Sequence, residues 1–258
     1  MEKASKGGAA AKTSLGILVS LSAAHMLNDS MQSIISAVYP LIKEELALDF
    51  SQIGLIAFIY QISASIMQPL FGIYLDKRPN AWFLPAGLVF TMCGLLGIAF
   101  GGSFGCLAAA VFCSGIGSSI LHPEASRITS LASGGRRAFA QSIFQVGGSA
   151  GFAFGPLLAA VFVTPYGIKN VSIFSALAVF AIVGLIPACK WYANYIKNSQ
   201  TSEGVYEKKP PLKMSKTRIC LILGILLALI FSKNIYTISI SNYYTFYLME
   251  KFSVSLET

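Results

Sequence analysis

Apolar runs of about 20 residues recur along the chain, separated by short polar or glycine-containing breaks. A helix of that length crosses the hydrocarbon core of a bilayer, which is about 30 Å thick. The pattern therefore predicts an all-α membrane protein in which seven helices span the membrane. We expect these helices at residues 15–42, 51–74, 82–101, 104–122, 138–164, 170–189 and 217–248.

The composition supports a membrane protein and argues against an enzyme. Hydrophobic residues make up 55% of the chain and charged residues only 12%, so little of it lies outside the membrane to host catalysis. The sequence contains no phosphate-binding loop, nucleophile elbow or cluster of metal-ligating spacings. His122 and Glu124 stand in an HPE segment that lacks the second histidine of a zinc-binding HExxH motif. We therefore predict no enzymatic activity, no cofactor and no metal.

The basic residues are distributed by membrane side. Fifteen of the 19 fall in the N-terminus and in the second, fourth and sixth connections, while Lys43, Lys169 and Lys251 lie on the opposite side. The positive-inside rule then places the N-terminus in the cytoplasm of a multi-pass protein of the inner (plasma) membrane. The net charge of +8 thus indicates orientation in a lipid bilayer, and we expect no nucleic-acid partner.

The first apolar run has an alternative interpretation as a signal peptide. Lysines precede residues 15–21, and Ser22, Ala23 and Ala24 resemble a cleavage site. The apolar run continues well beyond these residues, however, which favours a membrane span.

The spacing of the expected helices predicts four segments. Residues 1–14 form a cytoplasmic N-terminus, and residues 15–189 form a compact set of six helices. Residues 190–216 are rich in Lys, Asn, Ser, Glu and Pro, as is typical of a linker. Residues 217–258 hold the first helix of a second half. A six-helix half joined by a cytoplasmic linker to another half is the plan of transporters whose halves rock about a central site.

Asp29 is an acid near the middle of the first expected span. A carboxylate there costs about 2.5 to 3.5 kcal/mol on insertion scales, so it normally faces a polar interior or takes part in a mechanism. His25, Asn28 and Gln32 lie on the same helical face as Asp29, because their spacing follows the helical period. We call these four residues the polar seam and predict that they line a pathway for protons and substrate.

Lys233 is a second charged residue inside an expected span, and Tyr236 lies close to its face. If Asp29 and Lys233 face one water-filled cavity, they can pair or bind substrate instead of being buried separately. The alternative is an ion pair that only fixes the packing of two helices.

Two motifs indicate helix movement and close packing. The segment GIYLDKRP contains Asp76, Lys77 and Arg78 and resembles the cytoplasmic loop signature of the major facilitator superfamily. With Glu124 and Arg127, these residues are candidate gating charges, since ion pairs at a helix junction can exist in only one of two orientations. Plain anchoring by positive charge is the alternative. The segment GGSAGFAFGP, with Gly147, Gly151, Gly155 and Pro156, resembles the antiporter motif of drug-exporting facilitators, although glycines at this spacing could serve packing alone.

A narrower resemblance is to the fosmidomycin resistance protein family. It is carried by HMLNDSMQS, HPEASR, SGGR, AQSIFQVGG and SNYYTFYLM, and it runs from about residue 13 to the C-terminus. The resemblance implies a twelve-span, proton-driven exporter of a small anionic drug such as fosmidomycin, with protons as the coupling ion. His122, a lone histidine before Pro123, is expected to be a structural hydrogen-bonding residue, with a proton relay as the alternative.

Two alternatives to export remain open. One is an importer of organic acids or sugars from the same superfamily, against which the export-type glycine motif argues. The other is a fragment that does not transport, because the chain ends soon after the seventh expected span. In that case the missing C-terminal half would be a partner on which function depends.

Overall fold

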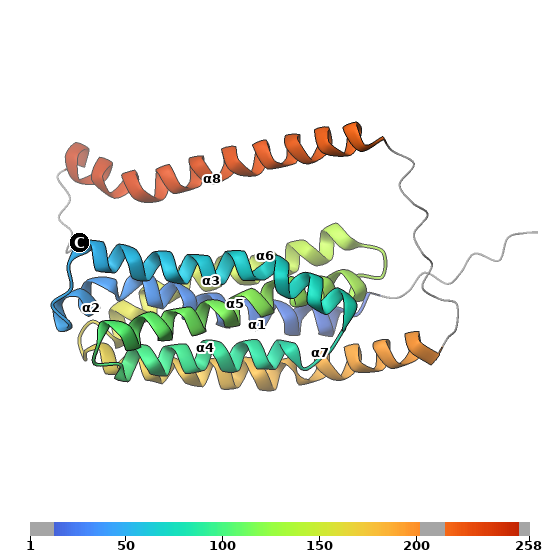
Figure 1. The fold of residues 1–258 in the computed structure, drawn as a ribbon, viewed down its shortest axis with the longest axis horizontal. Helices are drawn as coiled ribbons and strands as arrows, with labels where there is room; N and C mark the ends of the chain where they lie inside the picture. Colours follow the sequence, from blue (N-terminus) through green and yellow to red (C-terminus); the bar gives the residue numbers. More distant parts are fainter. Residues whose placement is uncertain (1–12, 202–214, 253–258) are drawn as a thin grey trace, which may run out of the picture. The chain divides into compact units, whose positions relative to one another are not determined.

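A computed structural model describes residues 13–201 and 215–252 of the chain (Figure 1). The regular elements within these ranges are helices, which confirms the predicted all-α class. They are α1 (Leu15–Ala37), α2 (Tyr39–Glu45), α3 (Phe50–Lys77), α4 (Phe83–Phe100), α5 (Phe104–Ala132), α6 (Arg137–Phe162), the 3-10 helix η1 (Ile168–Phe174), α7 (Ser175–Thr201) and α8 (Lys216–Phe252).

Five helical segments of the described residues are long and apolar enough to cross a membrane. They are Phe50–Lys77, Phe83–Phe100, Phe104–Ala132, Arg137–Phe162 and Ile168–Asn198. α1 is not among them, because the polar seam lowers the hydropathy of that helix. The chain is therefore a helical membrane protein, and the spanning roles of α1 and α8 stay predictions.

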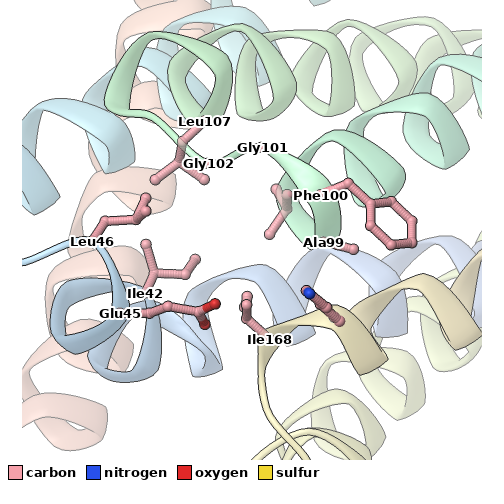
Figure 2. A pocket seen from close by; sticks show the side chains of 11 residues that line it. Ile42, Glu45, Leu46, Ala99, Phe100, Gly101, Gly102, Leu107 and Ile168 are labelled. Atoms are coloured by element: carbon pink, nitrogen blue, oxygen red, sulfur yellow. The ribbon is translucent and has the colours of Figure 1, made fainter.

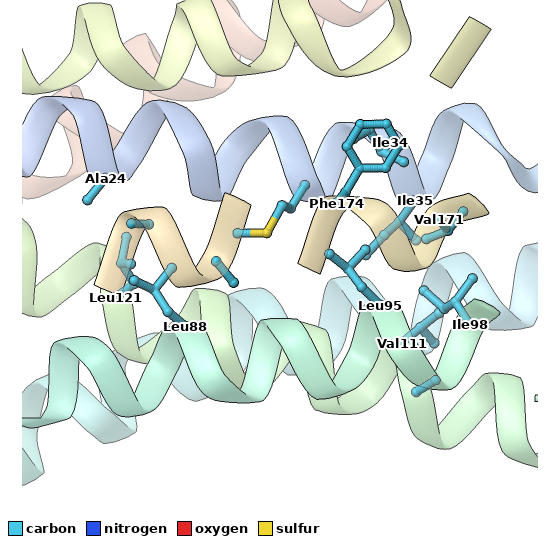
Figure 3. Close-up of a cluster of buried hydrophobic side chains, with 14 of the residues drawn as sticks. Ala24, Ile34, Ile35, Leu88, Leu95, Ile98, Val111, Leu121, Val171 and Phe174 are labelled. Carbon is cyan, nitrogen blue, oxygen red and sulfur yellow. The ribbon is translucent and has the colours of Figure 1, made fainter. Parts of the chain in front are cut away.

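The chain divides into two compact units, residues 1–202 and residues 203–258. In the first unit, α1 packs mainly on α6 and α7, and α5 packs on α3 and α4. Apolar side chains from α1, α4, α5 and η1 fill the space between these helices, and Figure 3 shows Ile35, Leu95, Val111 and Val171 among them. α1 is therefore enclosed along most of its length, and its polar seam lies inside the bundle. α8 belongs to the second unit.

Local chemistry explains where the helices begin. Asp49 starts α3 with a capping box, in which its carboxylate accepts from the Gln52 amide at 2.7 Å and the Gln52 side chain accepts from the Asp49 amide at 2.9 Å. Gly134 and Gly135 have φ values of 57° and 90°. This left-handed conformation suits glycine and turns the chain between α5 and α6.

The first expected span is shorter than predicted. The sequence suggested one helix over 15–42, but α1 ends at Ala37 and α2 begins at Tyr39. Pro40 explains the break, because its ring excludes it from a helix interior and fits it to the first turn of a new helix.

Two other helices, α5 and α7, continue about ten residues beyond their predicted ends. α5 was expected to end at residue 122 but continues through Pro123 to Ala132, so the HPEASR segment is helical instead of lying in a connection. Proline is tolerated inside membrane helices where neighbouring groups satisfy the freed carbonyl. α7 likewise continues past residue 189 to Thr201, so the expected linker 190–216 begins with helix.

Candidate functional site

Two histidines meet at the buried carboxylate of Asp29. The Nε2 atom of His25, one turn earlier on α1, lies 3.1 Å from Oδ2 of Asp29. The Nε2 atom of His122, on α5, lies 3.3 Å from Oδ1. We call these three residues the His–Asp–His cluster. His25 was predicted to lie in the polar seam, whereas for His122 a structural role was favoured over a proton relay.

Backbone carbonyls fix both imidazole rings. The Nδ1 atom of His25 lies 2.8 Å from the Phe144 carbonyl oxygen, and that of His122 lies 2.9 Å from the Ser118 carbonyl oxygen. A carbonyl oxygen can only accept a hydrogen bond, so each Nδ1 atom carries a proton and donates. Each Nε2 atom is therefore the one directed at Asp29, and its protonation is free to change.

Aromatic contacts hold the His25 ring between α5 and α6. The ring stacks on Phe144 with centroids 4.0 Å apart and planes inclined by 15°. It also meets the His122 ring edge-on, with centroids 5.0 Å apart and planes inclined by 87°. The cluster therefore lies where three helices, α1, α5 and α6, pack together.

The antiporter-like glycines bring α6 against α1 at this level. A Cβ atom added at Gly147, Gly151 or Gly155 would collide with backbone or side-chain atoms of α1. Gly148, which the sequence analysis did not single out, is the glycine nearest the cluster, since a Cβ there would lie 2.9 Å from Oδ2 of Asp29. These residues let the two helices approach closely. Pro156 lies inside α6, one residue after Gly155.

The rest of the polar seam connects α1 to α3 and α4. Asn28 donates to Oδ1 of Asp29 at 3.1 Å and accepts from Thr91 of α4 at 3.5 Å. Gln32 does not contact Asp29; its side-chain oxygen accepts from the Tyr60 hydroxyl of α3 at 2.7 Å. Tyr60 and Thr91 were missed, because neither stands out in an apolar helix without knowledge of its neighbours.

Three of the candidate gating charges form a network where α3 ends. Arg127 of α5 donates to the Leu75 carbonyl at 2.8 Å and forms an ion pair with Asp76. Its Nη1 atom also lies 3.1 Å from Oε2 of Glu124, a carboxylate that is buried. A guanidinium at a helix C-terminus satisfies orphan carbonyls and complements the helix dipole. Arg127 thus joins α5 to the end of α3.

The other two gating candidates are placed differently. Lys77 and Arg78 are exposed, and neither takes part in the ion pairs found among the described residues. Their participation in gating stays a prediction.

Replacement of Arg127 by glutamine should destabilise the protein. The change leaves the Glu124 carboxylate buried without its cation and removes a donor from the Leu75 carbonyl. We expect a loss of about 1 to 3 kcal/mol, measured as a lower unfolding temperature in detergent. Glu124→Gln added to Arg127→Gln should restore part of it, and the exposed Arg78→Gln serves as control. Equal stability of Arg127→Gln and Arg78→Gln would contradict the assigned network.

The His–Asp–His cluster also brings together three potential metal ligands. The two Nε2 atoms and a carboxylate oxygen all lie within 4.8 Å of one another, and this is the one such group among the described residues. Imidazole and carboxylate groups suit several divalent metals. The sequence could not reveal this group, because His122 is distant from His25 and Asp29 in the chain. The absence of a metal stays a prediction.

A cavity of about 230 Å³ lies at the other end of the bundle from Arg127. Figure 2 shows Glu45 of α2 and Phe100 at the end of α4 among its lining residues. None of the residues of the polar seam lines it. The cavity is therefore separate from the site around Asp29.

Lys233 and Tyr236 lie on α8, in the second unit, and both are exposed there. Asp29 lies in the first unit, so the predicted role of Lys233 and Tyr236 beside it stays a prediction.

The fold and the buried polar seam define a multi-pass membrane protein with polar side chains inside its helix bundle. The chain belongs to the Major Facilitator Superfamily, whose family model matches residues 21–258. This confirms the predicted superfamily, and it is a family of transporters rather than of enzymes.

Two curated relatives match nearly the whole chain. The fosmidomycin resistance protein of Escherichia coli (strain K12) is 47% identical over 247 residues, which is 96% of this chain and 60% of that protein. The uncharacterized MFS-type transporter YfnC of Bacillus subtilis (strain 168) is 40% identical over 241 residues, which is 93% of this chain and 59% of that protein. The chain thus spans about three fifths of the length of these relatives.

Proposed function

We propose that this chain provides the N-terminal part of a proton-coupled exporter of a small anionic drug such as fosmidomycin. The observation that carries the proposal is the buried carboxylate of Asp29 with an imidazole Nε2 atom on each side. α1 to α7 would supply the six spans of the first half, and α8 the first span of the second. Similarity to a protein named for fosmidomycin resistance supports the choice of substrate.

Asp29 is the proton-binding group in this proposal. A charged carboxylate inside the membrane is costly, and protonation removes that cost. Proton occupancy therefore changes the relative free energies of the inward-facing and outward-facing orientations. Export follows if bound protons favour one orientation and bound drug favours the other. The binding of each then returns the transporter from the orientation that the other favours.

The network of Arg127, Asp76 and Glu124 would hold one of these orientations. Its bonds join α5 to the end of α3, and α5 also carries His122. A change of proton occupancy at the cluster therefore acts on the same helix that carries the ion pairs. In the second half, Lys233 would offer a positive charge to the anionic substrate, with Tyr236 lining the same path.

An importer of organic acids or sugars is the second candidate, and the export-type glycine packing of α6 on α1 disfavours it.

Proton coupling is tested in everted membrane vesicles that contain the natural full-length gene product. Respiration acidifies the vesicle interior, and a pH-sensitive dye reports the gradient. We expect fosmidomycin to dissipate part of the gradient, because each exchange cycle moves protons out of the vesicle as the drug moves in. No effect of the drug on the gradient, in vesicles that accumulate it, would contradict proton coupling.

A further inference from the structure

Backbone carbonyls determine which atoms of the His–Asp–His cluster carry protons. Both Nδ1 atoms are committed as donors, His25 to Phe144 and His122 to Ser118. Both Nε2 atoms face the same carboxylate, at 3.1 and 3.3 Å. A hydrogen bond across either gap therefore needs a proton in addition to those on the Nδ1 atoms.

Three states follow from this arrangement. With no extra proton, two nitrogen lone pairs face two carboxylate oxygens, no hydrogen bond joins either ring to the carboxylate, and the cluster carries one negative charge. One proton makes one hydrogen bond and a neutral cluster. Two protons make both hydrogen bonds and give one positive charge. Buried polar groups favour states in which they are paired, so each Nε2 atom offers a place for one further proton.

The three side chains differ in the fraction of their surface that is exposed. The His25 side chain is 3% exposed and that of Asp29 is 5% exposed, whereas that of His122 is 25% exposed. Phe144 covers one face of the His25 ring, and Gly148 of α6 approaches its edge. Within the cluster, His122 is thus the most exposed member.

No other charged group competes with Asp29 for His122 in the described contacts. α1 presents Asp29 and His25, and α3 presents Tyr60, which is bonded to Gln32. α4 presents Thr91 and α6 presents Phe144, and neither is charged. On α5 itself the nearest charged groups, Glu124 and Arg127, are engaged with each other, and Arg127 also pairs with Asp76 of α3.

We propose that His122 is the residue through which the cluster exchanges protons with water, and that His25 is a positioning residue that holds the second shared proton. In the exchange step a hydronium ion protonates Nε2 of His122 and becomes water. The N–H bond of the imidazolium then breaks as an O–H bond forms at Oδ1 of Asp29, which leaves His122 neutral. This inference rests on the proposed role of Asp29 in proton coupling.

Nitrogen NMR of histidine tests the inference without any transport assay. The chain contains only two histidines, so labelling histidine with ¹⁵N in the purified chain reports on the cluster alone. The variants His25→Gln and His122→Gln assign the signals. We expect both neutral rings to be protonated at Nδ1, and we expect the Nε2 proton of His122 to exchange with water at least tenfold faster than that of His25.

A neutral His122 protonated at Nε2 would overturn the proposal, and so would faster exchange at His25. Asp29→Asn should change the titration of His122, because the carboxylate that shares its proton is gone. An unchanged titration of His122 in Asp29→Asn would also overturn it.

A transport assay separates this inference from the proposed function. Glutamine at position 122 keeps a hydrogen-bonding group beside Asp29 but cannot carry a proton. We expect His122→Gln, in the natural full-length gene product, to lose the pH dependence of export and at least tenfold of its rate, with normal amounts in the membrane. An unchanged pH profile would overturn the role of His122. Loss of export in Asp29→Asn would still support the proposed function in that case.

Discussion

An Asp29→Asn protein should reach the membrane in normal amounts and lose proton-driven drug resistance. Asparagine has almost the same shape as aspartate, and its amide still donates to one Nε2 atom and accepts from Asn28, so the packing of the cluster is kept. It cannot take up and release a proton. We expect the drug resistance of the cells to fall to that of cells without the protein. The initial efflux rate should fall at least a hundredfold below that of the wild type.

Asp49→Asn is the matched control for this change. Asp49 is exposed and caps α3, and asparagine caps helices as well as aspartate does. The control should export like the wild type, so a loss in Asp29→Asn reflects its position and not the type of substitution. Full, gradient-dependent efflux by Asp29→Asn would contradict the assignment of Asp29 as the proton site.

A Gly151→Val protein should fail to fold stably. The added Cβ atom would lie 2.9 Å from the Ser30 amide nitrogen and 3.0 Å from Cβ of Asp29, and it would collide with the Met26 carbonyl oxygen. Most of these atoms belong to the α1 backbone and cannot turn aside. Overpacking typically costs about 1 to 3 kcal/mol and occasionally more, and here it meets rigid backbone, so we expect little monodisperse protein after solubilisation and a markedly lower unfolding temperature.

Gly54→Val separates the packing effect from any effect of valine in a helix. Gly54 lies on α3, and a Cβ atom there meets nothing within 4 Å. This control should solubilise and unfold like the wild type. Equal stability of the two variants would show that α6 does not pack on α1 as the structure has it.

Much of the fold followed from hydrophobic runs. Helical period also placed His25, Asn28 and Asp29 on one face, and the structure buries all three. Period identifies the residues that share a face of one helix but not what lies opposite. His122 is distant in the chain, and only the packing of α5 on α1 brings it to Asp29.

The errors at helix ends have a similar cause. A proline has opposite consequences at two positions: Pro40 separates α1 from α2, whereas α5 continues through Pro123. Neighbouring helices decide whether the freed carbonyl can be satisfied, and the sequence around a proline does not reveal them. HPEASR was placed beyond the end of the fourth expected span, although the i, i+3 spacing of Glu124 and Arg127 already allowed the ion pair that forms on α5.

Proton release on drug binding tests the central claim most directly. The natural full-length gene product, purified in weakly buffered detergent solution, is mixed with fosmidomycin while a pH indicator records protons in solution. We predict that the wild type and Asp49→Asn release protons on binding and that Asp29→Asn binds the drug without releasing any. Equal release by wild type and Asp29→Asn would contradict the claim that the buried carboxylate on α1 carries the coupled proton.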